Sequence, residues 1–104
     1  MRIIDFHSHY YPPAYLDALR SSPSAVQVSI DQDGNLRLDY RGDYNIVVRG
    51  HRDIDYREQV LVQHGIDTQV LMLTTPGTHV ETPATAARLA SLGNDALASV
   101  TKSK

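Results

Sequence analysis

The sequence predicts an α/β fold in which parallel strands alternate with helices. Two apolar segments, residues 2–6 and 66–74, are typical of buried strands, and helical segments follow both of them. Alternating segments between residues 26 and 48 predict a β-hairpin inserted after the first strand. Two parallel strands are too few for a covered sheet. We therefore expect this chain of 104 residues to be the N-terminal segment of a larger domain, with no second domain in it.

The first half of the chain carries signals for a strand, a helix and the hairpin. Residues 2–6 are nearly all apolar, which suits a central parallel strand that is covered on both sides. A helix is expected over residues 13–20, because a proline occupies its first position. Apolar and polar residues alternate in 26–30 and again in 36–40 around a glycine-containing turn, the pattern of a hairpin. Residues 44–48 could form a third short strand.

The second half of the chain reads as helix, strand, helix, and residues with known positional preferences mark its boundaries. Aspartate and threonine favour helix N-caps, proline the first helical turn, and glycine a left-handed cap at the helix end. The expected boundaries are a helix from Asp53 or Asp55 to about His64, a left-handed cap at Gly65, a strand within 66–74, and a helix over 84–100 that follows Thr82 as N-cap and Pro83 as first residue.

Composition excludes several classes of function. The chain is 41% hydrophobic and 21% charged, and its formal net charge of -2 gives no electrostatic basis for binding nucleic acid or an anionic membrane. It has no cysteine, so disulfides and thiolate metal sites are excluded. No apolar stretch approaches the about 18 residues of a membrane span, and no signal peptide is evident, so a cytoplasmic location is expected.

His7 and His9 form a His-x-His pair at the end of the first strand. Side chains two residues apart in a strand point to the same face, so both imidazoles can reach one cation at about 2.0–2.1 Å from each ring nitrogen. The C-terminal ends of barrel strands are where such sites lie. The alternative to a metal site is that both histidines are ordinary polar residues at the end of a strand. Asp5 can support the pair by a hydrogen bond or serve a structural role.

The histidine pair belongs to a longer pattern. The segment "DFHSHYYP" resembles the opening of the metal-dependent amidohydrolase superfamily, in particular the amidohydrolase-related branch that includes aminocarboxymuconate-semialdehyde decarboxylase and the resorcylate-type decarboxylases. The resemblance covers nearly the whole chain except its last six residues. It continues in residues 55–57 and 63–67 (first barrel helix and entry to the next strand), 70–76 (second strand and loop), 92–97 (an Asn-Asp pair) and 26–48 (the inserted hairpin).

The resemblance implies a fold, a cofactor and a class of reaction. The fold is a (β/α)8 TIM barrel, of which this chain supplies the N-terminal part with its hairpin insertion. The cofactor is one divalent metal, zinc or sometimes manganese, with His7 and His9 as its first two ligands and the other ligands on later strands. The implied activity is metal-dependent hydrolysis or non-oxidative decarboxylation of a small carboxylated or cyclic substrate. The catalytic residues lie outside this chain, so we expect it to be inactive alone.

Two further residues are candidates for contacting the substrate. The related decarboxylases hold a substrate carboxylate with an arginine of the hairpin, and Ile46 occupies that position here. Arg49 or Arg52 could serve instead, although solvent-exposed charge is the favoured interpretation of both. His79 follows the second strand on the face where the metal would lie, and it can line the pocket or be an ordinary loop residue.

Other functions remain open at this point. A non-catalytic interaction module derived from the same fold would pair its free strand edges with another copy or a completing chain. Other His-x-His enzymes, such as histidinol-phosphatase-type phosphoesterases or TatD-like nucleases, lack the inserted hairpin and the "HxHxxP" run.

Overall fold

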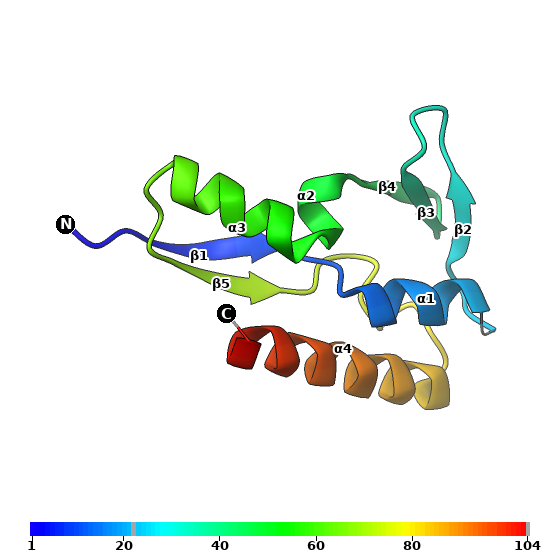
Figure 1. The fold of residues 1–104 in the computed structure, drawn as a ribbon. Helices are drawn as coiled ribbons and strands as arrows, with labels where there is room; N and C mark the ends of the chain where they lie inside the picture. Colours follow the sequence, from blue (N-terminus) through cyan, green and yellow to red (C-terminus); the bar gives the residue numbers. More distant parts are fainter. Residues whose placement is uncertain (22, 104) are drawn as a thin grey trace.

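The structure is a computed structural model that describes residues 1–21 and 23–103. In this part the chain forms a small mixed α/β domain with four helices and two sheets. Figure 1 places the two sheets at opposite ends of the molecule, with α4 running beneath β5 and α1. The elements in chain order are β1 (Ile4–His9), α1 (Pro13–Ser21), β2 (Gln27–Ile30), β3 (Leu36–Tyr40), β4 (Asp43–Val47), α2 (Arg49–Arg52), α3 (Ile54–Gln63), β5 (Thr68–Met72) and α4 (Pro83–Ser103).

The first and last strands form the parallel pair that the sequence predicts. β1 and β5 lie side by side and run in the same direction, with the hairpin insertion and α3 in the crossover between them. The predicted strand covers residues 2–6, whereas β1 begins at Ile4 and ends at His9. It ends later than predicted because its pairing with β5 continues to His9↔Met72. Both histidines therefore lie within the strand instead of following it.

The inserted hairpin is confirmed and is a three-stranded antiparallel sheet in the order β2–β3–β4. Gln27 pairs with Asp39 and Ile30 with Leu36, so β2 and β3 enclose a tight turn in which Gly34 has a positive φ of 81°. Glycine adopts this conformation without steric cost. β4 follows another turn, and it corresponds to the third short strand expected over residues 44–48.

The predicted boundaries of α3 are confirmed by the groups that satisfy its ends. Asp53 is the N-cap, and its side chain accepts a hydrogen bond from the Tyr56 backbone N–H at 3.1 Å. The helix ends at Gln63, and Gly65 has a positive φ of 67°, as expected for a left-handed cap. The short α2 helix before it was not predicted, since four residues carry no helical period.

The hydrophobic core lies between α1, the hairpin sheet, α4 and the loop after β5, away from the parallel pair. It comprises Tyr11, Tyr15, Leu16, Leu19, Val26, Leu38, Tyr40, Val47, Val80 and Leu89. The expectation that the first strand is covered on both sides is wrong for the described residues. Phe6 is 71% exposed and Ile4 is 43% exposed, because β5 and the helices leave one side of β1 without a packing layer.

Candidate functional site

A β-bulge in β1 shapes the segment that carries the histidines. Asp5 pairs with Gln69 and Ser8 with Leu71, so Phe6 and His7 together face the single residue Val70. A bulge of this kind bends its strand and redirects its side chains. The usual alternation of faces along β1 is therefore broken at His7, one of the two predicted ligands.

The two imidazoles of His7 and His9 converge. Their Nε2 atoms are 2.9 Å apart, and the ring centroids are separated by 4.8 Å at an interplanar angle of 56°. With neutral rings this is a hydrogen bond in which one Nε2–H donates to the other Nε2. The structure thus brings together the two residues that the His-x-His spacing predicted to meet.

The separation of these nitrogens also suits two ligands of one metal ion. A tetrahedral zinc ion with ring nitrogens at about 2.0–2.1 Å holds them about 3.3 Å apart. The observed 2.9 Å differs by about 0.4 Å, a change that small rotations of the two side chains can supply. Within residues 1–21 and 23–103, no group of three or more His, Cys, Asp or Glu side chains is arranged to hold a metal. Any ion held at this point would therefore meet only these two imidazoles among the described residues.

Asp5 is occupied by contacts within the parallel pair. Its carboxylate accepts a hydrogen bond from Gln69 Nε2 at 2.9 Å and another from the His7 backbone N–H at 3.1 Å. These two hydrogen bonds lower the pKa of Asp5. The carboxylate thus contacts the backbone of His7 and the side chain of Gln69.

Arg57, on α3, joins the polar groups on either side of the bulge. Its Nε donates to Gln69 Oε1 at 2.7 Å, one terminal nitrogen donates to Ser8 Oγ, and the other donates to the Gly50 carbonyl at 2.5 Å. Its guanidinium carbon also lies 5.8 Å from the centre of the Tyr10 ring. Burial lowers the pKa of Arg57. Sequence reasoning missed this role, because Ser8 is 49 residues away along the chain.

Arg49 is held by side chains of the α2–α3 junction. Its Nε lies 3.0 Å from Asp53 Oδ2, and its guanidinium stacks 4.5 Å above the Tyr56 ring. The side chain is still 61% exposed, so its outer face is open to solvent. A role for Arg49 in holding a substrate remains a prediction.

His79 lies in the loop that follows β5. Two buried tyrosines fix this loop, since Tyr11 donates to the Thr75 carbonyl at 2.7 Å and Tyr15 to the Gly77 carbonyl at 2.6 Å. The His79 ring folds back on the turn, with Nδ1 3.8 Å from where a Cβ on Gly77 would lie. In the described part of the chain it does not join His7 and His9 in a three-ligand group.

His51 lies in the short α2 helix. Its Nδ1 is buried and has no hydrogen-bond partner among the described residues. Its ring meets the Tyr11 ring edge-on, with centroids 6.0 Å apart, and its carbonyl accepts the Tyr11 N–H at 2.6 Å. Burial is the main cause of its lowered pKa, and a backbone hydrogen bond at Ile46 acts in the opposite direction. His51 therefore sits near the C-terminal end of β1.

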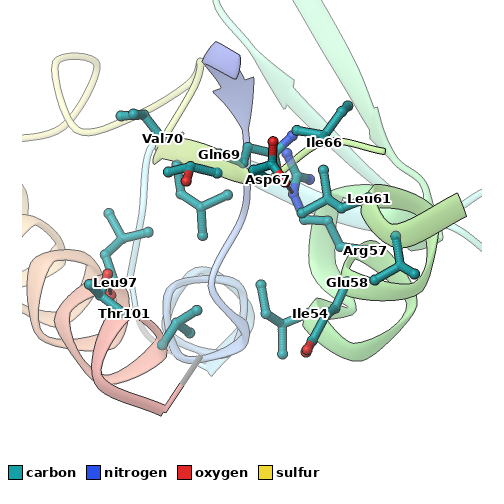
Figure 2. Close-up of a pocket in the computed structure, with 14 residues that line it drawn as sticks. Ile54, Arg57, Glu58, Leu61, Ile66, Asp67, Gln69, Val70, Leu97 and Thr101 are labelled. Carbon is teal, nitrogen blue, oxygen red and sulfur yellow. Dashed lines mark hydrogen bonds between the residues drawn. The ribbon is translucent and has the colours of Figure 1, made fainter. Parts of the chain in front are cut away.

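A hollow of about 630 Å³ lies between α3, β5 and α4. Figure 2 shows Leu97 and Thr101 of α4 on one side and Ile54 and Leu61 of α3 on the other. Its lining is largely apolar and does not include His7 or His9. The hollow runs along β5. The outer edge of this strand has no paired strand among the described residues.

No protein-family model matches the sequence, and no curated protein matches it. The resemblance to the amidohydrolase-related branch therefore stays a prediction that depends on the residues themselves. Among the described helices, none combines the length and the apolar character needed to cross a membrane.

Proposed function

We propose that this chain is the N-terminal part of a metal-dependent enzyme of the amidohydrolase-related type, with His7 and His9 as two ligands of a divalent metal. The observation that carries the proposal is the 2.9 Å approach of the two Nε2 atoms at the C-terminal end of a parallel strand. Imidazole nitrogens suit zinc, and the resemblance to the amidohydrolase-related branch implies zinc or sometimes manganese. The expected complete fold is a (β/α)8 barrel.

The chain's own residues bind and orient but do not transfer protons. His7 and His9 hold the metal, and Asp5 fixes the His7 backbone through its hydrogen bond to that N–H. When bound, the metal supplies a Lewis acid that activates water or polarises a substrate oxygen. The reaction class is hydrolysis or non-oxidative decarboxylation of a small carboxylated or cyclic substrate. Arg49 and His79 remain the candidates for contacting that substrate.

Metal titration of the whole chain tests this proposal. We expect zinc, measured by competition with a chromophoric chelator, to bind at one ion per chain. His7→Gln and His9→Gln should each abolish stoichiometric binding, because one imidazole makes a poor site. His64→Gln is the matched control, since it removes a histidine from the end of α3 and leaves the pair intact. Absence of binding to the wild-type chain, or equal loss in all three variants, would contradict the proposal.

Activity assays test the expected incompleteness. The purified chain should neither hydrolyse esters and lactones nor release carbon dioxide from aromatic carboxylates. A catalytic zinc normally has three protein ligands, and the described residues bring no third one to His7 and His9. Zinc-dependent turnover by the chain alone, lost in His9→Gln, would contradict this expectation, because it would show that the chain is a complete enzyme without further metal ligands.

An interaction module without metal chemistry is the second candidate. The observation that favours it is the exposure of apolar side chains along the parallel pair: 71% for Phe6, 43% for Ile4 and 41% for Val70. The two-stranded sheet also leaves the outer edges of β1 and β5 without a paired strand among the described residues, and such edges pair readily with other strands. Self-association in sedimentation experiments that persists in chelator and disappears in Phe6→Ser would favour this candidate. Association that requires zinc and both histidines would instead support a shared metal site.

A further inference from the structure

The β1 bulge is not held by the strand ladder. Phe6 and His7 face one residue of β5, so the ladder pairs Asp5 and Ser8 but not both residues between them. Phe6 is 71% exposed, and its side chain therefore provides little packing to fix the bulge. Yet the bulge contains His7, whose ring meets His9 at 2.9 Å. Some other set of contacts must set the course of the backbone here.

A chain of polar side chains spans the bulge from one end to the other. Before the bulge, the Asp5 carboxylate accepts from Gln69 Nε2 at 2.9 Å. Gln69 Oε1 in turn accepts from Arg57 Nε at 2.7 Å. After the bulge, Ser8 Oγ accepts from the Arg57 guanidinium. Asp5 and Ser8 are thereby tied to one another through Gln69 and Arg57, with Phe6 and His7 between them.

We propose that Arg57 is the positioning residue of the histidine pair: by bridging Ser8 and the Gln69–Asp5 contact, it fixes the bulge in the conformation that brings both Nε2 atoms to one metal ion. The metal part of this inference rests on the proposed function. Arg57 does not contact the metal position itself, and it acts through the backbone of β1. A hydrogen bond to the Gly50 carbonyl anchors the guanidinium to the start of α2.

The geometry requires arginine specifically. Three acceptors surround the guanidinium: Ser8 Oγ, Gln69 Oε1 and the Gly50 carbonyl. A planar fork can serve all three at once, whereas a lysine ammonium is a point charge that cannot reproduce the fork. Arg57→Lys should therefore keep the positive charge but lose the hydrogen bond to at least one of these three acceptors. Residues that orient metal ligands in this indirect way affect metal affinity by about 10–100-fold when they are removed.

Four variants of the full chain test the inference by zinc competition and by unfolding in urea. Arg57→Met, Arg57→Lys and Ser8→Ala should weaken zinc binding by about tenfold or more. The matched control is Arg37→Met, which loses an ion pair with Asp39 and stacking on Tyr44 in the hairpin sheet but does not touch the bulge. Its zinc affinity should equal that of the wild type. Ser8→Ala keeps the test valid if the Arg57 variants do not fold.

Nitrogen NMR of the imidazoles in the metal-free chain separates this inference from the proposed function. In the wild type, the Nε2 signals of His7 and His9 should show the hydrogen bond between them, and Ser8→Ala should remove it. If the wild type binds no zinc but the variants still lose this signal, the proposed function fails and the positioning role stands. Wild-type imidazole signals and zinc affinity in folded Arg57→Met and Ser8→Ala would overturn the positioning role.

Discussion

Alkaline pH should destabilise this protein through Tyr11, whose ring is only 2% exposed. Its hydroxyl donates to the Thr75 carbonyl, and burial raises its pKa from 10.0 to about 12. The neutral form is the one the folded state favours, so the stabilisation is complete below pH 10 and is lost as the pH rises toward 12. From these two values, the free energy of unfolding falls by about 1.4 kcal/mol at pH 11 and about 2.3 kcal/mol at pH 12, relative to pH 8.

The composition makes this experiment unusually clean. The only lysines are Lys102 and Lys104, so tyrosines are most of the groups that titrate between pH 9 and 12. Urea unfolding followed by circular dichroism at about pH 8, 10 and 11 gives the stability at each pH. Burial also raises the pKa of Tyr15, which acts in the same direction, so the measured loss should be at least that expected from Tyr11 alone.

Two phenylalanine variants connect the loss to the residue. Tyr11→Phe should lower stability at pH 8 by about 1 kcal/mol, because the Thr75 carbonyl loses one of its donors, and should flatten the dependence on pH. Tyr44→Phe is the control, since this ring is 51% exposed. A wild-type stability that is constant from pH 8 to 11, or a slope that Tyr11→Phe leaves unchanged, would refute the reasoning.

Three further substitutions test the fold. Leu89→Ala removes a fully buried core side chain and should reduce the free energy of unfolding in urea by about 2–5 kcal/mol, and a loss below 1 kcal/mol would place Leu89 outside the core. Asp53→Ala removes the α3 N-cap bond to Tyr56 and should cost about 1 kcal/mol, with Asp53→Asn largely restoring it. Gly65→Ala places a side chain at a φ of 67° and should cost about 1–2 kcal/mol in thermal unfolding, and an unchanged melting temperature would argue against the left-handed cap.

The sequence was most informative where structure depends on near neighbours. The hairpin was predictable because alternation and a glycine turn specify an antiparallel pair locally. The limits of α3 were predictable because Asp53 and Gly65 act within one turn of the helix. The spacing of His7 and His9 predicted that their rings would meet, and they do, although the bulge at His7 interrupts the alternation on which that prediction depended.

The features that sequence analysis missed depend on residues far apart in the chain. The bulge arises from the register of β1 against β5, more than sixty residues away, and strand alternation carries no sign of it. The contact between Arg57 and Ser8 spans 49 residues, and an arginine in a helix is usually solvated. The exposure of Phe6 was mispredicted because an apolar run indicates that a strand can be covered, not that a covering layer lies within the same chain.

The histidine pair lies at a boundary between the exposed and the buried halves of the molecule. Phe6 is mostly exposed, whereas Tyr10 and Tyr11, directly after His9, are 1% and 2% exposed. The backbone N–H of Tyr10 donates to the Met72 carbonyl at 3.0 Å and that of Tyr11 to the His51 carbonyl at 2.6 Å, so the core fixes the strand immediately after His9. On the other side of His9, the contacts of Arg57 with Ser8 and Gln69 supply the constraint.

The geometry of the histidine pair and the global stability of the fold therefore depend on different contacts. Loss of Leu89 weakens a core that touches neither the bulge nor its polar contacts, whereas loss of the Ser8 hydroxyl removes one hydrogen bond beside the histidines and little apolar packing. Distant sites that share no partners have independent energetic effects. Folded Leu89→Ala should therefore keep wild-type zinc affinity despite its large loss of stability, while Ser8→Ala should show the reverse. Parallel losses of both quantities in both variants would mean that the histidine pair depends on the core instead of on the polar contacts around the bulge.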